Sequence, residues 1–366
     1  MKKTNLKLIA FENCEVFGNK VDSHLQKILK EKKANIVNIV CSRFNNGEGK
    51  AYISESVRNK DLYILSDVTN YSVHYDYYGS LHRMSPDEHF QDIKRVISAT
   101  NGKFSKVTVI MPFLYQSRQH RRKEKESLDC ALALQELERI GVNNIITFDC
   151  HDPNVSNAIP NLPFENIFAT ETILKDLFTC EKIDVGTEKM LVISPDMGAM
   201  ERARYYAEIL GCDVGLFYKR RDLSQIVDGK NPIIEHVYLG KNPKDSIVFV
   251  VDDMIASGGS MIDVACELHK RGAKSIFLIA TFALFTSGIE KFDEAYQKNL
   301  FTKIYSTNLA YVPDMIKQKS WYHDVDCSKQ LAEVIIEHNM TGEIENVQLN
   351  DEVQLIEQIN RIGERL

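Results

Sequence analysis

Several features that would reveal a function directly are missing from this chain. It contains no C-x-x-C pair, no Walker A loop and no G-x-G-x-x-G motif. These absences exclude zinc ribbons, thioredoxin-type redox centres and two common glycine-rich nucleotide loops. The eight cysteines are scattered, so we expect a reduced, cytoplasmic protein. No apolar run reaches the roughly 20 residues of a membrane span, and the stretch 6–11 is too short and too broken for a signal peptide.

The composition also lacks a strong excess of either charge. The 45 Lys and Arg residues stand against 51 Asp and Glu residues, for a formal net charge of -6. This balance argues against binding nucleic acid through many phosphate contacts. Local clusters of cations can still serve small phosphorylated ligands. With 44% hydrophobic residues in a chain of 366, we expect a globular protein with a large core and two domains.

Short β-branched runs recur along the chain, each followed by an amphipathic stretch, and predict βα units in a parallel sheet. The runs are nearly continuous in apolar residues, as in strands that are covered on both faces. The helices between them end just before Gly141, Gly211 and Gly272. The expected strands are 107–111, 144–148, 190–193, 247–251 and 275–281, and the expected helices are 128–140, 199–210 and 261–271.

Three segments differ from this pattern. Residues 36–65 have shorter alternating runs around a glycine-rich turn and predict a hairpin-like element. Residues 70–84 are rich in tyrosine and histidine, which fits either a functional loop or interface arm, or a surface loop packed by its own aromatic rings. In residues 351–366 apolar side chains recur at every third position, which predicts an amphipathic terminal helix.

The most informative stretch follows the expected strand 247–251. Asp252 and Asp253 lead into residues 254–260, which hold two glycines and two serines at the start of a helix. Backbone N–H groups at a helix N-terminus attract phosphate, and the carboxyl end of a parallel strand is where open α/β sheets bind ligands. We therefore expect a sugar phosphate here, with carboxylates accepting hydroxyl protons directly or through magnesium. A solvated acidic turn capped by serine is the alternative that the residues alone leave open.

The stretch from Val250 to Ser260 resembles the phosphoribosyl-diphosphate fingerprint of type I phosphoribosyltransferases. Six further motifs, in order and approximate spacing, resemble ribose-phosphate diphosphokinase, also called phosphoribosyl pyrophosphate synthetase, over roughly residues 36 to 290. Seven ordered motifs are much more specific than any one of them. The six are Arg43 to Glu48 with Arg58, Pro112-Phe113 followed by 117–121, Asp149-Cys150-His151, 194–198, Arg202-Ala203-Arg204 and Lys219-Arg220-Arg221.

The resemblance implies an α/β fold of two related phosphoribosyltransferase-type domains, each a mostly parallel sheet flanked by helices. It places the N-terminal domain at residues 1–160, the C-terminal domain with the ribose-phosphate loop at 161–325, and a helical extension at 326–366. It also implies a homo-oligomer, a dimer or a hexamer of dimers, because in the family a neighbouring subunit supplies the loop that corresponds to 44–48. Neither nucleic acid nor a membrane is an expected partner.

The activity implied by the resemblance is transfer of the diphosphoryl group of MgATP to the 1-hydroxyl of ribose 5-phosphate. The products are AMP and 5-phosphoribosyl 1-diphosphate, a precursor for nucleotide biosynthesis. In the family, Lys219 and Arg221 would serve catalysis, and His151 and Asp196 would hold Mg²⁺. ATP would contact Phe44, Asn46, Glu48, Arg118, Gln119 and His151, and ribose 5-phosphate would contact Asp252, Asp253, Ala256, Ser257, Gly258, Gly259 and Ser260.

Some positions depart from the family's pattern. Ala256, Asn46 and His120 stand where the family has aspartates, and Ser257 and Ser260 stand where it has threonines. The serines keep the hydroxyl groups, whereas Ala256 removes a carboxylate. Two alternatives therefore remain: a catalytically weak regulatory paralogue that assembles with an active partner, and a phosphoribosyltransferase that consumes the activated sugar.

Overall fold

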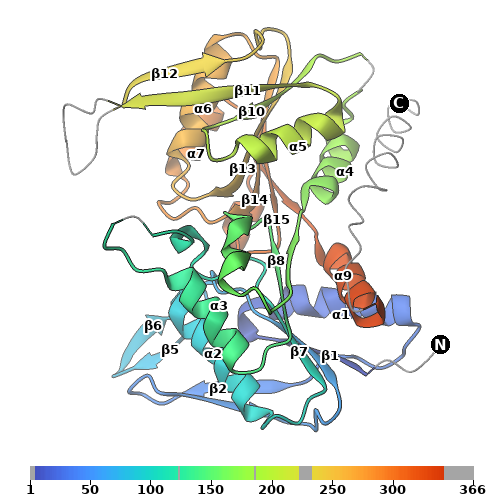
Figure 1. The fold of residues 1–366 in the computed structure, drawn as a ribbon. Helices are drawn as coiled ribbons and strands as arrows, with labels where there is room; N and C mark the ends of the chain where they lie inside the picture. The colour runs from blue at the N-terminus through green and yellow to red at the C-terminus, as the bar shows by residue number, and fades with distance from the viewer. Residues whose placement is uncertain (1–4, 123, 185–186, 222–232, 342–366) are drawn as a thin grey trace. The chain divides into compact units, whose positions relative to one another are not determined.

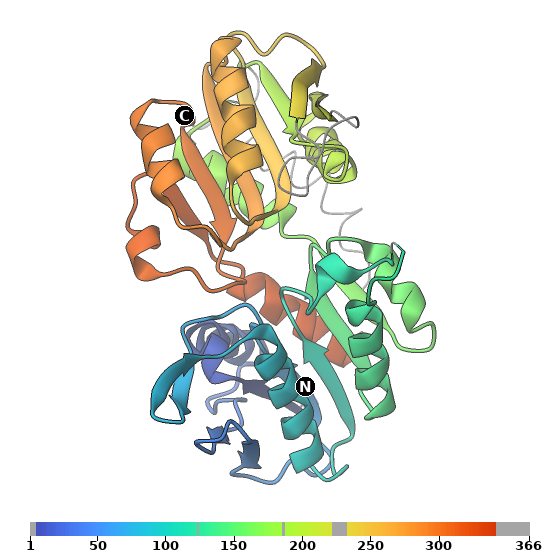
Figure 2. The same ribbon diagram turned by 90° about the vertical axis from the view of Figure 1, so that its left-hand side faces the viewer.

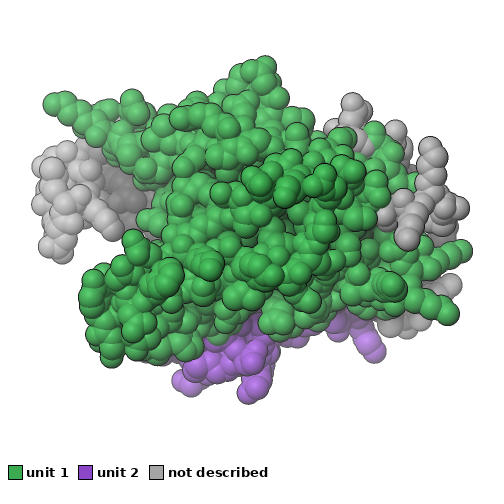
Figure 3. Space-filling model, turned by 90° about the horizontal axis from the view of Figure 1, so that it is seen from below, with its two compact units in different colours: residues 1–169, 308–311, 326–345 green, residues 170–307, 312–325, 346–366 purple. Residues whose placement is uncertain are grey.

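The computed structural model describes residues 5–122, 124–184, 187–221 and 233–341. This part of the chain forms two compact units, which Figure 3 colours green and purple. Unit 1 contains residues up to Ala169 together with 308–311 and 326–341, and unit 2 contains the described residues of 170–307 and 312–325. The expected terminal helix 351–366 lies outside the described residues. None of the described helices combines the length and apolar character needed to cross a bilayer.

Unit 1 is built on a five-stranded parallel sheet in the order β1-β4-β7-β8-β9 (Figure 1). The last helix among the described residues, α9, lies beside α1 although the two are far apart in the sequence (Figure 1). The strands are β1 (Leu6–Ala10), β4 (Asp61–Leu65), β7 (Lys106–Ile110), β8 (Asn144–Phe148) and β9 (Phe164–Ile167), and the helices are α1 (Glu15–Leu29), α2 (Pro86–Ala99), α3 (Asp129–Arg139) and α9 (Ser328–Thr341).

Two antiparallel hairpins, seen in blue and cyan in Figure 2, are also part of unit 1. The first, β2 (Ile39–Arg43) with β3 (Gly49–Ile53), is the hairpin that the sequence predicts. The second, β5 (His74–Tyr77) with β6 (Ser80–Arg83), replaces the expected loop at 70–84. The backbone turns between its strands at two residues with positive φ, 49° and 79°, as two-residue hairpin turns require. Tyrosine favours strands, so this composition fits a hairpin as well as a loop.

Unit 2 has a seven-stranded sheet in the order β12-β11-β10-β13-β14-β15-β16, parallel except for the β11–β12 pair. The strands are β10 (Met190–Ser194), β11 (Asp213–Arg221), β12 (Ile233–Leu239), β13 (Ile247–Ile255), β14 (Ser275–Ala283), β15 (Lys303–Thr307) and β16 (Tyr322–Val325). The helices are α4 (Thr170–Glu181), α5 (Met200–Leu210), α6 (Gly259–Lys270), α7 (Glu290–Gln297) and α8 (Asp314–Lys317).

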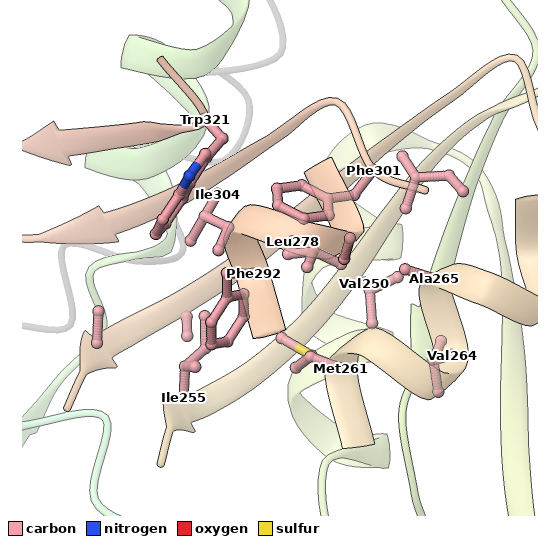
Figure 4. Packing of buried hydrophobic residues seen from close by; sticks show 14 of the residues in the cluster. Val250, Ile255, Met261, Val264, Ala265, Leu278, Phe292, Phe301, Ile304 and Trp321 are labelled. Atoms are coloured by element: carbon pink, nitrogen blue, oxygen red, sulfur yellow. The ribbon is translucent and has the colours of Figure 1, made fainter. Parts of the chain in front are cut away.

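The core of unit 2 lies where α6 and α7 pack on the sheet (Figure 4). Val250 and Leu278 from adjacent strands, and Met261 from α6, are almost fully buried. The rings of Phe292 and Trp321 stack with their centroids 5.8 Å apart. Because burial of each such side chain stabilises by roughly 1.5–3 kcal/mol, this cluster gives the start of α6 a rigid support.

Candidate active site

The loop between β13 and α6 has a backbone that only glycine accommodates. Gly258 adopts φ 75° and ψ -8°, and a Cβ atom at this position would collide with the ring of Phe292. Apart from its chain neighbours and the backbone of α6, a Cβ at Gly259 would, in contrast, meet no heavy atom of the described residues within 4 Å. Since α6 begins at Gly259, the N–H groups of its first turn have no acceptor within the helix. The loop thus presents backbone donors beside open space, as a phosphate site requires.

The chain that follows β14 holds this loop in place. The carbonyl of Ile255 accepts from the N–H of Leu284 at 2.9 Å and from that of Phe285 at 3.1 Å. The carbonyl of Ala256 accepts from the N–H of Thr286 at 2.9 Å. These bonds extend the β13–β14 pairing past the polar residues that end the apolar run, so β13 is four residues longer than the sequence predicts.

Two carboxylates precede the loop. Asp253 is 3% exposed, and Oδ1 of Asp252 accepts from the backbone N–H of Asp253 at 2.9 Å. Burial and the neighbouring Asp253 carboxylate both raise the pKa of Asp252 well above its usual range, while Arg202 opposes them. A site that concentrates negative charge in this way favours ligands that bring hydroxyl donors or a cation.

Asp196 follows β10, the strand that pairs with β13. Its Oδ1 accepts from the N–H groups of Gly198 at 2.8 Å and Ala199 at 3.3 Å, which fixes an exposed carboxylate just before α5. The chain runs from β10 to β11 on one side and then crosses to β13 on the other. Asp196 and the Asp252–Ser260 stretch therefore flank a reversal of strand order, where open α/β sheets bind ligands.

Lys219 and Arg221 lie at the end of β11, the other neighbour of β10. The pairing between β10 and β11 ends at Leu216, so both residues lie beyond it, toward the same edge as the loop. On its other side β11 pairs with β12, and Lys219 lies opposite His236. The unit 2 residues of the predicted site thus lie at, or just after, the ends of three adjacent strands.

In unit 1 a second group of predicted residues comes together after β7 and β8. The carbonyl of Pro112 accepts from the N–H of Phe148 at 3.0 Å, which ties the chain after β7 to the end of β8. A short 3-10 helix, Ser117–Gln119, then carries Arg118, whose side chain is exposed, and Gln119. The rings of His120 and His151 lie 5.3 Å apart, centroid to centroid.

Asp152 is a residue that the sequence analysis missed. Its Oδ2 lies 3.2 Å from Nε2 of His120, whose Nδ1 is 3.1 Å from the carbonyl of Ser117. The resemblance implies an aspartate at the position of His120, and here the carboxylate of Asp152 lies beside the His120 ring. The only signal in the sequence is that Asp152 directly follows His151.

The turn that contains Phe44, Asn46 and Glu48 closes the β2–β3 hairpin. The N–H of Phe44 donates to the carbonyl of Glu48 at 2.8 Å, and Nδ2 of Asn46 donates to Oε2 of Glu48 at 3.0 Å. The ring of Phe44 is 58% exposed. An exposed ring beside a carboxylate and an amide can stack on a base and hydrogen-bond to it.

The tyrosine-rich β5–β6 hairpin packs against this turn (Figure 2). The N–H of Tyr78 donates to the carbonyl of Asn45 at 2.9 Å, and a Cβ at Gly47, where φ is 89°, would lie 3.1 Å from Cε2 of Tyr77. The hairpin is anchored in turn by Tyr75, whose hydroxyl donates to Glu88 on α2 at 2.6 Å. The hairpin therefore braces the turn.

The predicted site residues are thus divided between the two units. Unit 1 brings Arg118, Gln119 and His151 to one edge of its sheet, and carries Phe44, Asn46 and Glu48 on a hairpin. The predicted site residues of unit 2 lie around the strand reversal. They are Asp196, Lys219, Arg221, Asp252, Asp253, Ala256, Ser257, Gly258, Gly259 and Ser260.

Comparison with known proteins matches two family models to two successive parts of the chain. The model of the N-terminal domain of ribose phosphate pyrophosphokinase matches residues 6–141, and that of the phosphoribosyl transferase domain matches residues 165–313. Ribose-phosphate pyrophosphokinase of Vibrio vulnificus is 27% identical over 75% of this chain and 80% of its own length. The Mycoplasma genitalium protein of that name is 28% identical over 83% and 85%. Phosphoribosylpyrophosphate synthetase from Mycobacterium smegmatis shares the fold, with a TM-score of 0.73 and 20% identity over 92% of this chain and 98% of that one.

Proposed function

The chain belongs to the ribose-phosphate pyrophosphokinase family, and on that premise we propose that it transfers the diphosphoryl group of MgATP to the 1-hydroxyl of ribose 5-phosphate. The products are AMP and 5-phosphoribosyl 1-diphosphate. The observation that carries this proposal is the glycine-dependent loop Ala256–Ser260 at the strand reversal of unit 2, separated by two residues from the adjacent carboxylates of Asp252 and Asp253.

We propose that the loop binds the 5-phosphate and that Asp252 and Asp253 orient the ribose hydroxyls. Backbone N–H groups at the start of α6 supply donors to the phosphate, and the hydroxyls of Ser257 and Ser260 add to them. The 1-hydroxyl then attacks the β-phosphorus of ATP, the bond from that phosphorus to the α-phosphate oxygen breaks, and AMP leaves. The protein contributes by positioning the reactants and neutralising charge.

The remaining site residues have three proposed roles, which are stabilisation of negative charge, binding of Mg²⁺ and binding of ATP. Lys219 and Arg221 stabilise the charge that develops on the transferring group. Asp196 fits Mg²⁺, because its carboxylate is exposed and its Oδ2 has no hydrogen-bond partner among the described residues. His151 is the second proposed ligand. Bound Mg²⁺ would neutralise negative charge on the phosphates. ATP is held by Phe44, Asn46, Glu48, Arg118 and Gln119.

We also propose that the protein is a cytoplasmic homo-oligomer. The eight free cysteines support a reducing compartment. In the oligomer, the Phe44–Glu48 turn would complete the ATP site of a neighbouring subunit. Sedimentation of the purified chain tests this, and a fully active monomer would contradict it.

A regulatory paralogue with weak activity remains a second candidate because of one observation. Ala256 places no carboxylate at the start of the loop, so this loop has one acceptor fewer for ribose or magnesium than the family's pattern has. In this reading the chain would keep the fold and stimulate an active relative.

Formation of AMP from MgATP and ribose 5-phosphate separates the two candidates. The full-length chain is assayed over a range of Mg²⁺ and inorganic phosphate concentrations, with omission of ribose 5-phosphate as the control. AMP that depends on ribose 5-phosphate supports the enzyme. Absence of AMP under all these conditions would eliminate it, and stimulation of an active relative by this chain would then support the paralogue.

A further inference from the structure

Unit 2 holds three side chains of different chemistry together on its surface, away from the strand reversal. Asp176 and Cys180 lie one turn apart on α4, and His323 lies on β16, the edge strand of the sheet. One potential ligand atom from each residue lies within 4.8 Å of the other two. Helical spacing of four residues brings the first two to one face of α4, and the fold supplies the third from 143 residues farther along the chain.

The distances are close to those of a tetrahedral zinc site. In such a site zinc lies about 2.3 Å from sulfur and about 2.0 Å from nitrogen or oxygen. The sulfur atom is then about 3.5 Å from each of the other two ligand atoms, and the nitrogen atom is about 3.3 Å from the oxygen atom. Sγ of Cys180 lies 3.7 Å from Oδ1 of Asp176 and 4.0 Å from Nε2 of His323. Nε2 of His323 lies 2.6 Å from Oδ2 of Asp176. To reach tetrahedral spacing, Sγ and Nε2 have to approach by about 0.5 Å, and Nε2 and the Asp176 carboxylate have to separate by about 0.7 Å.

The surroundings support such a site. The ring of Tyr305 packs against that of His323 with centroids 4.7 Å apart, which restricts the orientation of the imidazole. Glu181, the next residue on α4, accepts from Lys303 at 2.5 Å and from the Tyr305 hydroxyl at 2.6 Å, so its carboxylate is already engaged. Asp176 and His323 are about one-third exposed, at 35% and 30%. A metal ion can therefore enter from solvent and keep water as a fourth ligand.

We propose that Asp176, Cys180 and His323 bind a divalent transition-metal ion, with Zn²⁺ the ion that suits these donors. Thiolate together with imidazole suits Zn²⁺, whereas Mg²⁺ favours oxygen ligands and is not bound by thiolate. The thiolate of Cys180 therefore distinguishes this site from the proposed Mg²⁺ ligands of the reaction. The bound ion replaces the Asp176–His323 hydrogen bond and joins the last turn of α4 to the edge strand β16.

Metal titration of the full-length chain tests the proposal. After treatment with a chelator, the protein is equilibrated with Zn²⁺ in the presence of excess Mg²⁺, and bound zinc per chain is measured. Wild type is expected to bind one ion more than Cys180→Ser and His323→Gln. Each of these substitutions should weaken binding at the site by at least about 100-fold, because even the loss of an outer partner of a ligand costs 10–100-fold. With Co²⁺ in place of Zn²⁺, wild type should show a sulfur-to-cobalt absorption band that Cys180→Ser lacks.

Cys266→Ser is the matched control, because Cys266 is a partly buried free thiol on α6, a different helix of unit 2. It should bind zinc as wild type does. Asp176→Asn keeps a hydrogen bond to His323 and separates loss of the metal ligand from loss of that bond. Far-ultraviolet circular dichroism verifies that each variant is folded. Equal zinc stoichiometry in wild type and Cys180→Ser, or a cobalt band that survives this substitution, would overturn the proposal.

Discussion

Five strands have the same order in the sheets of both units. The units differ in the segment of chain that follows the second strand in this order. The order β1-β4-β7-β8-β9 of unit 1 corresponds to β10-β13-β14-β15-β16 of unit 2. On the free side of the first strand, each unit has an antiparallel hairpin. In unit 2 the first part of β11, Asp213 to Leu216, pairs with β10. In unit 1 the chain leading to β2–β3 makes only an isolated parallel bridge, from Ile36 to Leu8 of β1.

After the second strand the two units diverge. In unit 2, β13 is followed by the five-residue stretch Ala256–Ser260, which runs into α6. In unit 1, β4 is followed by the tyrosine-rich hairpin and then by α2. The same topological position thus forms a phosphate-type cradle in one unit and a brace for a neighbouring turn in the other. A fold offers positions for a site, and the residues at those positions decide its chemistry.

The largest effect that the comparison predicts concerns the two hairpins beside the first strands. If β11–β12 carries catalytic cations, Lys219→Ala lowers kcat by about 100-fold or more, because a charge-stabilising group is lost from the transition state. The control is Lys241→Ala, an exposed lysine paired with Asp213 at the start of β11, which should leave kcat unchanged. The rate of AMP formation at saturating substrates is the measurement. Unchanged AMP formation in Lys219→Ala would contradict the proposed mechanism.

Much of the fold could be predicted because local rules determine it. The strand 144–148 coincides with β8, and the expected helix ends coincide with glycines of positive φ, Gly141, Gly211 and Gly272. Apolar runs of a few residues identify central parallel strands, and a glycine in the left-handed region ends a helix. These signals lie within a few residues of the element that they define.

The rest depends on contacts between distant residues or on unexpected backbone conformations. Tyr78 takes a positive φ of 49° that tyrosine rarely adopts, so the sequence does not predict its two-residue turn. The pairing of His120 with Asp152, and that of Asp176 with His323, span 32 and 147 residues. No periodicity in the sequence reports such proximity. The sequence identified the loop after Asp253, but only the structure shows that Phe292 makes Gly258 necessary.

The second prediction compares two adjacent glycines in the unit 2 loop. Gly258→Ala should lower the free energy of unfolding by about 2–4 kcal/mol, because alanine is strained at this φ and its Cβ meets Phe292. Gly259→Ala should change it by less than about 1 kcal/mol, since the space around it is open. Urea unfolding of both variants provides the measurement. Equal destabilisation would show that the loop does not depend on the conformation of Gly258.

The third prediction concerns the β5–β6 hairpin of unit 1, which follows the second strand of its sheet as the phosphate-type loop does in unit 2. Tyr77→Ala removes ring contacts beside Gly47 and with Tyr75 and should raise the KM for ATP about fivefold with kcat unchanged, because such contacts contribute roughly 0.5–1.5 kcal/mol. Leu81→Ala, on the same hairpin but 72% exposed, is the control and should leave KM unchanged. If both variants behave like wild type, the hairpin does not brace the turn.

The smallest effect is expected beneath the unit 2 loop, at Asp293. This residue follows Phe292, and its carboxylate accepts from Lys319 at 2.8 Å and from the Trp321 indole N–H at 2.8 Å. These donors, Lys319 foremost, hold the pKa of Asp293 below its usual range, against the effect of partial burial. Since the side chain is 33% exposed, solvent screening limits the stabilisation to about 0.5–1 kcal/mol.

Because the folded-state pKa of Asp293 is lowered, its stabilisation is present above the unfolded-state pKa of about 3.9 and is lost as the pH falls through the folded-state value. Asp293→Asn should therefore unfold more easily than wild type at pH 7, and the difference should shrink as the pH drops below about 4. Urea unfolding of both proteins across this range is the measurement. If the difference in unfolding free energy between wild type and Asp293→Asn stays constant with pH, Asp293 acts through packing beside Phe292 and Trp321. In that case only apolar contacts support the loop.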